Sequence, residues 1–308
     1  MIIYQSGNWL TLIRQFHQSD TIRDLFGKLL VVAAYVTVFT VVDMELFDHR
    51  PPVNSSYLST MGILLSLLVA FRTNKAYDRF WEGRTLWGSL ISACRNCAIV
   101  VHSVLPKDDE RNRIFFARML TNYAGALRDH LRGNVDVRQL EEMEPAVRAS
   151  VERQRHKPTA IASELQVRME ELRRAGVMAD IHLLSWQHEH DRLLQINGGC
   201  ERIYRTPIPF SYSFFIKLFI TAYIMLMPVA LLDTWGYFTI PAVLFAAYIL
   251  IGIELISEEI EEPFGWDIND ISTGQLAQAV RVTVHELLGV TLDDVQPQAV
   301  NPDFTVVH

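Results

Sequence analysis

Two long apolar runs constrain this chain most, because each is long enough to cross a membrane as a helix. Residues 210–232 (FSYSFFIKLFITAYIMLMPVALL) carry one charge, Lys217, and residues 235–253 carry none. A hydrocarbon core of about 30 Å needs about 20 apolar residues in a helix. Only Asp233 and Thr234 separate the two runs, so the sequence predicts a transmembrane hairpin. We expect Lys217 to reach the membrane surface or to face a neighbouring helix.

Two shorter apolar runs, residues 29–42 and 57–71, come earlier in the chain. Each is short for a bilayer, so either run taken alone could also be a buried helix of a soluble protein. Half of the chain's residues are hydrophobic, which soluble domains also approach, but the mean hydropathy is positive, +0.14, which favours counting both runs as membrane spans. We therefore predict an all-α, multi-span membrane protein with four transmembrane helices.

The distribution of charge predicts which helix ends lie in the cytoplasm. Four crossings place both termini on the same side of the membrane. Acidic residues stand in the loops after the first and third runs, whereas basic residues gather at the opposite helix ends: Arg14, Arg23, Lys28, Arg72, Lys75, Arg79, Arg84, Arg202 and Arg205. By the positive-inside rule, both termini are cytoplasmic. The expected location is the inner, or cytoplasmic, membrane.

The chain therefore divides into five expected segments. Residues 1–27 form a cytoplasmic or interfacial helix, although packing on the protein's own surface explains that helix equally well. Residues 28–71 hold the first two transmembrane helices, and residues 72–209 form a large helical cytoplasmic region. Residues 210–256 hold the last two transmembrane helices, and residues 257–308 form a cytoplasmic segment with a tail.

Helix signals recur in the two cytoplasmic segments. Acidic starts, glycine ends and apolar periodicity predict helices over these stretches: 106–133, 160–174, 178–204 and 272–289. Ser272 and Gln275 have the spacing of a capping box at the start of the last helix. Residues 134–158 are charged and weakly periodic, which predicts a loop that contains about one helical turn. The tail from Thr291 onward is expected to be extended or disordered.

Several classes of function find little support. The net charge of −7 and the lack of a basic domain argue against a nucleic-acid partner. Cys94 and Cys97 form a lone C-x-x-C pair in a chain with three cysteines, which favours buried thiols over a zinc or redox site. His188 and His190 stand two residues apart and point to different faces of a helix. No nucleophile–base pair or phosphate-binding loop is visible, so an enzyme is the least favoured class.

The second apolar run continues without a turn residue into FRTNKAYDRFWEGRTLWGSL, residues 71–90. We expect one continuous helix across this join. Ile63, Leu67 and Phe71 stand at i, i+4 and i+8 and therefore share one face of the helix. Contact with lipid is the ordinary explanation of such a face.

Charges and aromatic side chains are mixed in the rest of this stretch. Opposite charges three residues apart can pair, namely Lys75 with Asp78 and Arg79 with Glu82. A helix at the membrane surface with an aromatic belt would explain Trp81. The acidic residues so close to the membrane boundary fit better with burial between helices or subunits, where ion pairs are satisfied internally.

This stretch resembles the signature of the bestrophin family, in particular of its prokaryotic members. The matching positions are Arg72, Asn74, Tyr77, Arg79, Phe80, Trp81, Glu82, Arg84, Trp87 and Gly88. A second stretch, EEPFGWDIND at residues 261–270, resembles the family's later Pro-Phe-Gly motif. With the four predicted spans and the helical cytoplasmic region, the resemblance extends over about residues 1–290.

The resemblance implies a homopentameric ion channel in a lipid bilayer, with the second transmembrane helix of each subunit lining a central pore. In the family, the narrow neck of the pore is built from three apolar rings, which fall here on Ile63, Leu67 and Phe71. A further constriction near the cytoplasmic exit falls on Ile181 by its position. The signature residues would then form a structural motif that holds the neck: Arg72, Asn74, Tyr77, Arg79, Trp81, Glu82 and Trp87.

The sequence supports two competing expectations for the charge of the conducted ion, a cation or an anion. Apolar rings carry no charge that selects a sign, so selectivity depends on neck width and on the field of the vestibules. Five copies of a chain with net charge −7 carry −35, which enriches monovalent cations near the pore, and the prokaryotic likeness favours cations as well. An anion (chloride) channel of the same architecture is the alternative, because animal members conduct anions. A membrane-anchored scaffold or regulator is the third hypothesis.

The resemblance also raises the question of a bound metal ion. Animal members of the family hold calcium with acidic residues after Pro-Phe-Gly, and the matching positions are Asp267 and Asp270. Calcium takes six to eight oxygen ligands, and this stretch is less acidic than its animal counterpart. Capping of the next helix, or pairing with nearby arginines, explains both residues as well. We expect conduction to require no cofactor, with a calcium or other divalent ion as an optional addition.

Overall fold

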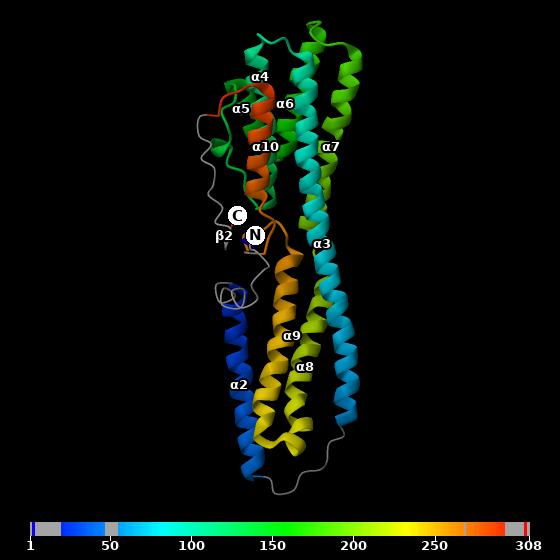
Figure 1. Cartoon of the computed structure of the whole chain (residues 1–308), viewed down its shortest axis with the longest axis vertical. Coiled ribbons are helices and arrows are strands. Elements are labelled where there is room, and N and C mark those ends of the chain that lie inside the picture. Colours follow the sequence, from blue (N-terminus) through cyan, green and yellow to red (C-terminus); the bar gives the residue numbers. More distant parts are fainter. Residues whose placement is uncertain (1, 4–19, 47–54, 268, 293–304, 307–308) are drawn as a thin grey trace. The chain divides into compact units, whose positions relative to one another are not determined.

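The computed structural model is almost entirely helical, as the sequence predicts (Figure 1). The residues that it describes are 2–3, 20–46, 55–267, 269–292 and 305–306. Residues 4–19, on which most of the predicted N-terminal helix falls, lie outside the described residues.

The chain forms two compact units, which we name by their composition. The apolar unit comprises residues 5–80 and 207–262, and the bundle unit comprises residues 1–4, 81–206 and 263–308. One long helix, α3 (Ser55–Val104), contributes its first part to the apolar unit and the rest to the bundle unit. The predicted continuous helix across the join at residue 71 is therefore confirmed.

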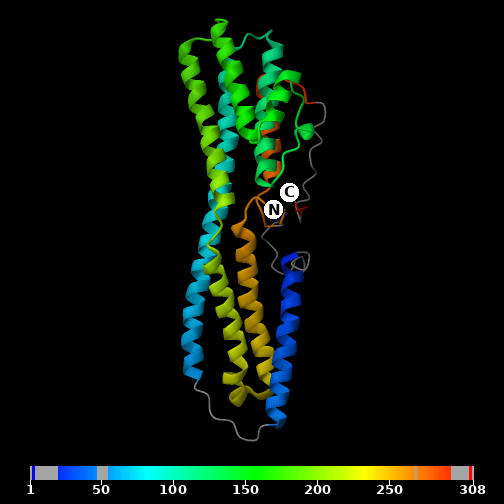
Figure 2. The same cartoon turned by 180° about the vertical axis from the view of Figure 1, so that it is seen from behind.

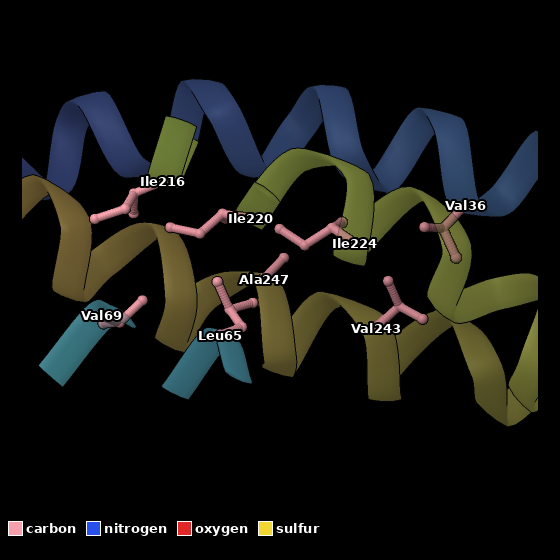
Figure 3. Packing of buried hydrophobic residues seen from close by; sticks show 8 residues of the cluster. All are labelled: Val36, Leu65, Val69, Ile216, Ile220, Ile224, Val243 and Ala247. Carbon is pink, nitrogen blue, oxygen red and sulfur yellow. The ribbon is translucent and has the colours of Figure 1, made fainter. Parts of the chain in front are cut away.

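Apolar side chains hold the apolar unit together. Its described helices are α2 (Asp20–Leu46), the first part of α3, α8 (Phe210–Trp235) and α9 (Thr239–Glu261). Helices α2 and α8 both pack against α9. All four helices contribute to one buried core, which Figure 3 shows: Val36, Leu65, Val69, Ile216, Ile220, Ile224, Val243 and Ala247. Because the three isoleucines stand four residues apart, they present one continuous face of α8 to this core.

Three stretches of the described residues are long and apolar enough to cross a membrane: Thr21–Glu45, Ser56–Val104 and Phe210–Glu261. The third stretch holds both α8 and α9, joined by the 3-10 helix η3 (Gly236–Phe238). A helix thus forms over each of the four predicted spans, and the number of crossings stays a prediction. The hairpin turn comes later than expected, because α8 continues to Trp235 and ends at Gly236, whose φ of 50° suits glycine.

The bundle unit contains the second part of α3 and further α-helices: α4 (Glu110–Leu131), α5 (Pro145–Arg153), α6 (Lys157–Arg174), α7 (Asp180–Arg205) and α10 (Thr273–Leu288). Helix α4 packs against α6 and α10, and α6 packs against α7, as seen from behind in Figure 2. A short 3-10 helix, η2 (Val137–Gln139), precedes α5. The two-residue strands β1 (Ile2–Ile3) and β2 (Thr305–Val306) pair antiparallel.

Two local predictions for the bundle unit are wrong. The expected loop over residues 134–158 contains α5, a helix of nine residues rather than one turn. Proline suits the first turn of a helix, and Val147 and Val151 stand one turn apart and are both buried, which stabilises this short helix. Ser272 does precede α10, but its side chain makes no capping hydrogen bond, so the expected capping box does not form. Helix α10 ends at Gly289, as predicted, and Gly289 adopts the left-handed conformation.

Candidate functional site

The candidate site lies on α3, which runs for 50 residues without a proline. Two glycines in this helix allow close packing. A Cβ atom at Gly62 would lie 2.7 Å from the Tyr223 hydroxyl in the apolar unit. A Cβ atom at Gly83 would lie 3.1 Å from the Phe264 ring in the bundle unit. Helix α3 is therefore in close contact with the rest of the apolar unit at Gly62 and with the rest of the bundle unit at Gly83.

The opposite side of α3 in the apolar unit is open in the single chain. We define the exposed stripe by its residues, which recur every three or four positions and are all exposed: Thr60, Ile63, Leu67, Phe71, Asn74 and Asp78. This spacing places them on one face of the helix. The stripe is apolar in its middle and polar at both ends.

The three predicted neck residues form the apolar middle of the exposed stripe. Ile63, Leu67 and Phe71 are 70%, 52% and 54% exposed, respectively. Leu65 and Val69, on the other face of the same turns, are almost completely buried in the core of the apolar unit. One face of α3 is therefore fixed by packing, while the other presents a row of large apolar side chains. Their role as pore neck stays a prediction.

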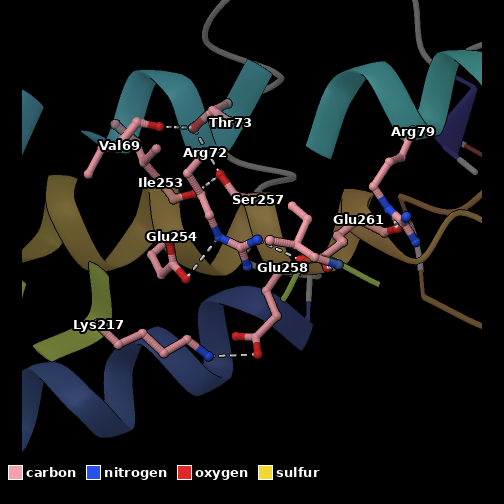
Figure 4. A network of polar contacts seen from close by, with 11 residues as sticks. Val69, Arg72, Thr73, Arg79, Lys217, Ile253, Glu254, Ser257, Glu258 and Glu261 are labelled. Carbon is pink, nitrogen blue, oxygen red and sulfur yellow. Dashed lines mark hydrogen bonds and ion pairs between the residues drawn. The ribbon is translucent and has the colours of Figure 1, made fainter. Parts of the chain in front are cut away.

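A buried ion-pair network begins directly after Phe71. The Arg72 side chain is 1% exposed, and its Nη1 atom donates to Oε2 of Glu261 at 2.6 Å (Figure 4). Its Nε atom donates to Oε1 of Glu254 at 3.4 Å. Both acidic residues lie on α9 and are buried. An isolated buried guanidinium would cost several kcal/mol, so these carboxylates are what allows Arg72 to be buried here.

Further hydrogen bonds connect the same stretches of α3 and α9. Arg79 Nε donates to the Glu261 carbonyl at 3.0 Å, and the hydroxyls of Thr73 and Ser257 lie 2.9 Å apart (Figure 4). Oε1 of Glu261 accepts a hydrogen bond from the backbone N–H of Ile208 at 2.7 Å. Both carboxylate oxygens of Glu261 are therefore engaged. We call Arg72, Thr73, Arg79, Glu254, Ser257 and Glu261 the Arg72 network.

The other signature residues lie in different surroundings. Asn74, Tyr77 and Trp81 are exposed, whereas Trp87 is completely buried in the bundle unit. The predicted pair of Lys75 with Asp78 forms at 3.1 Å between two exposed side chains. The signature therefore combines buried contacts with positions that remain free for contact with other molecules.

Glu82 has a different partner from the one expected. Instead of the predicted contact with Arg79, one turn earlier in α3, its carboxylate accepts a hydrogen bond from Arg202 of α7 at 2.5 Å. Arg79 donates to the Glu261 carbonyl. Both residues are thus used for contacts between helices that are far apart in the sequence.

Lys217, the single charge of the third apolar run, lies 2.7 Å from Glu258 of α9. Both side chains are about half exposed. This contact agrees with the expectation that Lys217 faces a neighbouring helix. Glu254 was not identified from the sequence as a functional residue. Its only signal is a carboxylate directly after an apolar run, and this signal does not reveal Arg72 as the partner.

The remaining predicted residues lie in the bundle unit. Ile181 is in the first turn of α7 and is exposed, and its assignment to a cytoplasmic aperture stays a prediction. Asp270 is buried and accepts a hydrogen bond from the Asp267 backbone N–H at 2.7 Å, whereas the Asp267 side chain is exposed. One oxygen of Asp270 therefore already stabilises the turn after α9. Calcium binding by these two residues stays a prediction.

The turn that contains Asp267 and Asp270 is fixed by the Pro-Phe-Gly motif. Phe264 is buried next to Gly83, and its carbonyl accepts a hydrogen bond from Arg132 Nε at 3.4 Å. The Arg132 guanidinium also lies over the Trp266 ring, 3.9 Å from its centre. The second motif of the sequence is thus part of the packing of the bundle unit.

Comparisons with known proteins identify the same family that the two sequence motifs resemble. A family model described as Bacterial/Fungal Bestrophin protein matches residues 1–286. A voltage-dependent anion channel-forming protein of Nostoc sp. is 32% identical over 261 residues, which cover 82% of this chain and 85% of that protein. A protein of the same description from Synechocystis sp. is 28% identical and covers 91% of this chain and 92% of its own.

Solved structures share the fold. The crystal structure of a bacterial bestrophin homologue from Klebsiella pneumoniae matches with a TM-score of 0.80 and 23% sequence identity. The match covers 87% of this chain and 99% of that one. At this identity the likeness establishes the fold alone.

Proposed function

The chain belongs to the bacterial and fungal bestrophin family, and on that premise we propose that it forms a membrane channel in which five copies surround an ion-conducting pore. In this proposal α3 lines the pore in each copy, and the exposed stripe faces the permeating ions. The protein resides in the inner membrane with four crossings per chain and both termini in the cytoplasm. The fivefold assembly follows from the family resemblance.

The observation that carries this proposal is the pattern of the exposed stripe. Between Thr60 and Asn74 the helix rises by about 21 Å, at 1.5 Å per residue. The hydrocarbon core of a bilayer is about 30 Å thick, so a stripe that faced lipid would place Thr60 or Asn74 in hydrocarbon. The Thr60 hydroxyl already donates to the Ser56 carbonyl at 3.0 Å, so the cost falls mainly on Asn74 and on Asp78 after it. A stripe that faces a water-filled pore meets no such cost. This supports a pore-lining position for the stripe.

The middle of the stripe is suited to a hydrophobic neck. Five copies of Ile63, Leu67 and Phe71 would form three apolar rings, one helical turn apart. A constriction of this kind conducts while it is wide enough to remain hydrated and closes to ions when it dewets. The Arg72 network lies next to Phe71 on the buried side of α3, so it fixes the position of the neck relative to α9.

We propose anions as the permeant ions. The named relatives from Nostoc and Synechocystis are both described as voltage-dependent anion channel-forming proteins, and they cover most of this chain. This favours the anion alternative over the cation preference that the sequence first suggested. The apolar neck itself is compatible with either sign.

A cation channel is the second candidate, and the net charge favours it. Each chain carries −7, so a pentamer has a strongly negative field that attracts cations. Asp78, at the polar end of the exposed stripe, would add a ring of five carboxylates close to the pore. The relatives' descriptions outweigh this argument, because net charge alone does not report the local field in the neck.

The test is a reversal potential. Purified protein reconstituted into a planar bilayer under a KCl gradient should give currents that reverse near the chloride equilibrium potential. Reversal near the potassium equilibrium potential would establish the cation channel instead. A verified pentamer that conducts neither ion would contradict both channels and favour a membrane-anchored scaffold or regulator.

A further inference from the structure

Three side chains with metal-binding atoms converge in the bundle unit. His130 lies in the last turn of α4, His156 directly precedes α6, and Glu201 lies on α7. One ligand atom from each lies within 4.8 Å of the others, and no second group of this kind occurs in the described part of the chain. His130 Nε2 is 3.2 Å from Glu201 Oε1, and His156 Nε2 contacts the same oxygen. Three separate segments thus meet at one point.

We propose that His130, His156 and Glu201 bind a divalent transition-metal ion, with zinc as the best-suited metal. Two imidazole nitrogens and a carboxylate oxygen are common zinc ligands, at about 2.0–2.1 Å from the ion. Tetrahedral ligands at that distance are about 3.3 Å from one another, and His130 Nε2 and Glu201 Oε1 have this spacing. His156 Nε2 lies closer than this to the same oxygen and has to move away from it to admit the ion. The fourth position would be filled by water. This site is separate from the exposed stripe and independent of the proposed conduction.

The surroundings of the cluster suit an ion that enters from solvent. The three side chains are each between 19% and 30% exposed, so they are partly shielded from water but still accessible. Asn197 Nδ2 donates to Glu201 Oε1 at 3.1 Å, which orients the carboxylate toward the histidines. Hydrogen-bond partners that orient metal ligands in this way increase metal affinity.

Metal binding has one structural cost at His156. Its Nδ1 atom accepts a hydrogen bond from the Thr159 backbone N–H at 3.1 Å and so caps α6. A metal at Nε2 requires the proton to be on Nδ1, which breaks this bond. The competing explanation is a purely structural one, in which both histidines donate hydrogen bonds to Glu201 and join α4, α6 and α7 without a metal.

Cobalt(II) titration of the full chain separates these two explanations. The protein would be purified in detergent, treated with a chelator, dialysed and titrated with cobalt(II), whose visible absorption reports tetrahedral coordination. We expect one cobalt ion per chain with an intense tetrahedral spectrum, displaced by zinc. In Glu201→Gln and His130→Asn, we expect the affinity to fall at least about tenfold. His188→Asn is the matched control, because His188 is exposed and lies outside the cluster, and it should bind as the wild type does.

Circular dichroism of each variant would establish that the chain still folds. Absence of stoichiometric cobalt binding in the wild type would overturn the proposal in favour of the hydrogen-bonded cluster. Equal binding by wild type and by folded Glu201→Gln would overturn it as well, because the metal would then be bound elsewhere. Neither outcome bears on ion conduction, so the proposed channel is tested separately.

Discussion

The guanidinium of Arg72 lies 2.6 Å from the carboxylate of Glu261, and both side chains are more than nine-tenths buried. Arg72 is the residue directly after Phe71, the last residue of the proposed neck. The contact therefore joins α3 to α9 within one residue of the neck. In the proposed channel, the position of the neck would therefore depend on a buried ion pair as well as on apolar packing.

Replacement of Arg72 by Met tests the energetic weight of this network. The variant leaves Glu254 and Glu261 buried without their cation, so we expect a destabilisation of about 3–5 kcal/mol. The destabilisation should appear as a lower midpoint temperature of thermal unfolding in detergent, followed by circular dichroism. Lys75→Met removes an ion pair of the same helix between exposed side chains and should cost only about 0–1 kcal/mol. Equal midpoints for both variants would show that the Arg72 network contributes little.

Long apolar and helical patterns made most of the fold predictable. The four apolar runs, the continuous α3 and the helices α4, α6, α7 and α10 follow from periodicity and from glycine or proline at helix ends. Helix α5 was missed because only two of its residues, Val147 and Val151, are buried, which is too weak a periodic signal.

Partners distant in the sequence could not be predicted in the same way. Local spacing offered Glu82 as a partner of Arg79, but the structure uses Arg202 and the Glu261 carbonyl for these residues. Side chains 120 or more residues apart become neighbours only through packing, so no sequence spacing reveals them. The neck residues could be placed on one face from the sequence, whereas the buried face opposite to them needed the structure.

Gly83→Ala tests the close packing of the two motifs. Alanine ordinarily stabilises a helix by about 1 kcal/mol relative to glycine. At this position the new Cβ atom would lie 3.1 Å from Phe264 and 3.2 Å from Ile271, which are both buried and cannot move aside easily. We expect a net destabilisation of about 1–3 kcal/mol, measured by thermal unfolding.

Gly198→Ala is the control for this substitution. Gly198 is exposed on α7, and nothing lies within 4 Å of the position of its Cβ atom. Its replacement should stabilise the protein by about 0.4–1 kcal/mol. A stabilising Gly83→Ala would contradict the tight contact between α3 and the Pro-Phe-Gly motif.

The stability of the bundle unit should depend on pH through Glu144. This carboxylate lies 3.1 Å from Arg111 of α4 and 2.9 Å from Arg168 of α6. Burial raises its pKa, but the hydrogen bond from Arg111 and the charge of Arg168 outweigh burial, so the pKa lies below the ordinary value of 4.5. Because the folded state binds its proton less readily than the unfolded state, this stabilisation is present above pH 4.5 and is lost as pH falls through the folded pKa.

Glu144→Gln should therefore lower the unfolding midpoint at neutral pH. The difference from the wild type should shrink as the pH falls below 4.5, where the wild-type carboxylate becomes protonated as well. Thermal unfolding over a pH series would measure both curves. Parallel curves over the whole series would show that Glu144 makes no ionic contribution to stability.

The size of the Leu67 side chain should limit conduction. Leu67→Ala shortens the side chains that form the middle ring of the proposed neck. We therefore expect a wider, more easily hydrated constriction and a larger single-channel current. Leu218→Ala is the matched control, because Leu218 on α8 is exposed to the same extent, 52%, but lies outside the exposed stripe. An unchanged current in Leu67→Ala alongside a verified assembly would contradict the neck.

The most direct test of the central claim is the accessibility of position 67 to water during conduction. The three native cysteines, Cys94, Cys97 and Cys200, are all buried, so the wild type should react little with a charged, water-soluble thiol reagent. In Leu67→Cys, the reagent should reach the pore and block the current across a planar bilayer. In Leu218→Cys, at an equally exposed position outside the stripe, it should have no effect. A Leu67→Cys current that the reagent leaves unchanged would contradict a water-filled pore lined by α3.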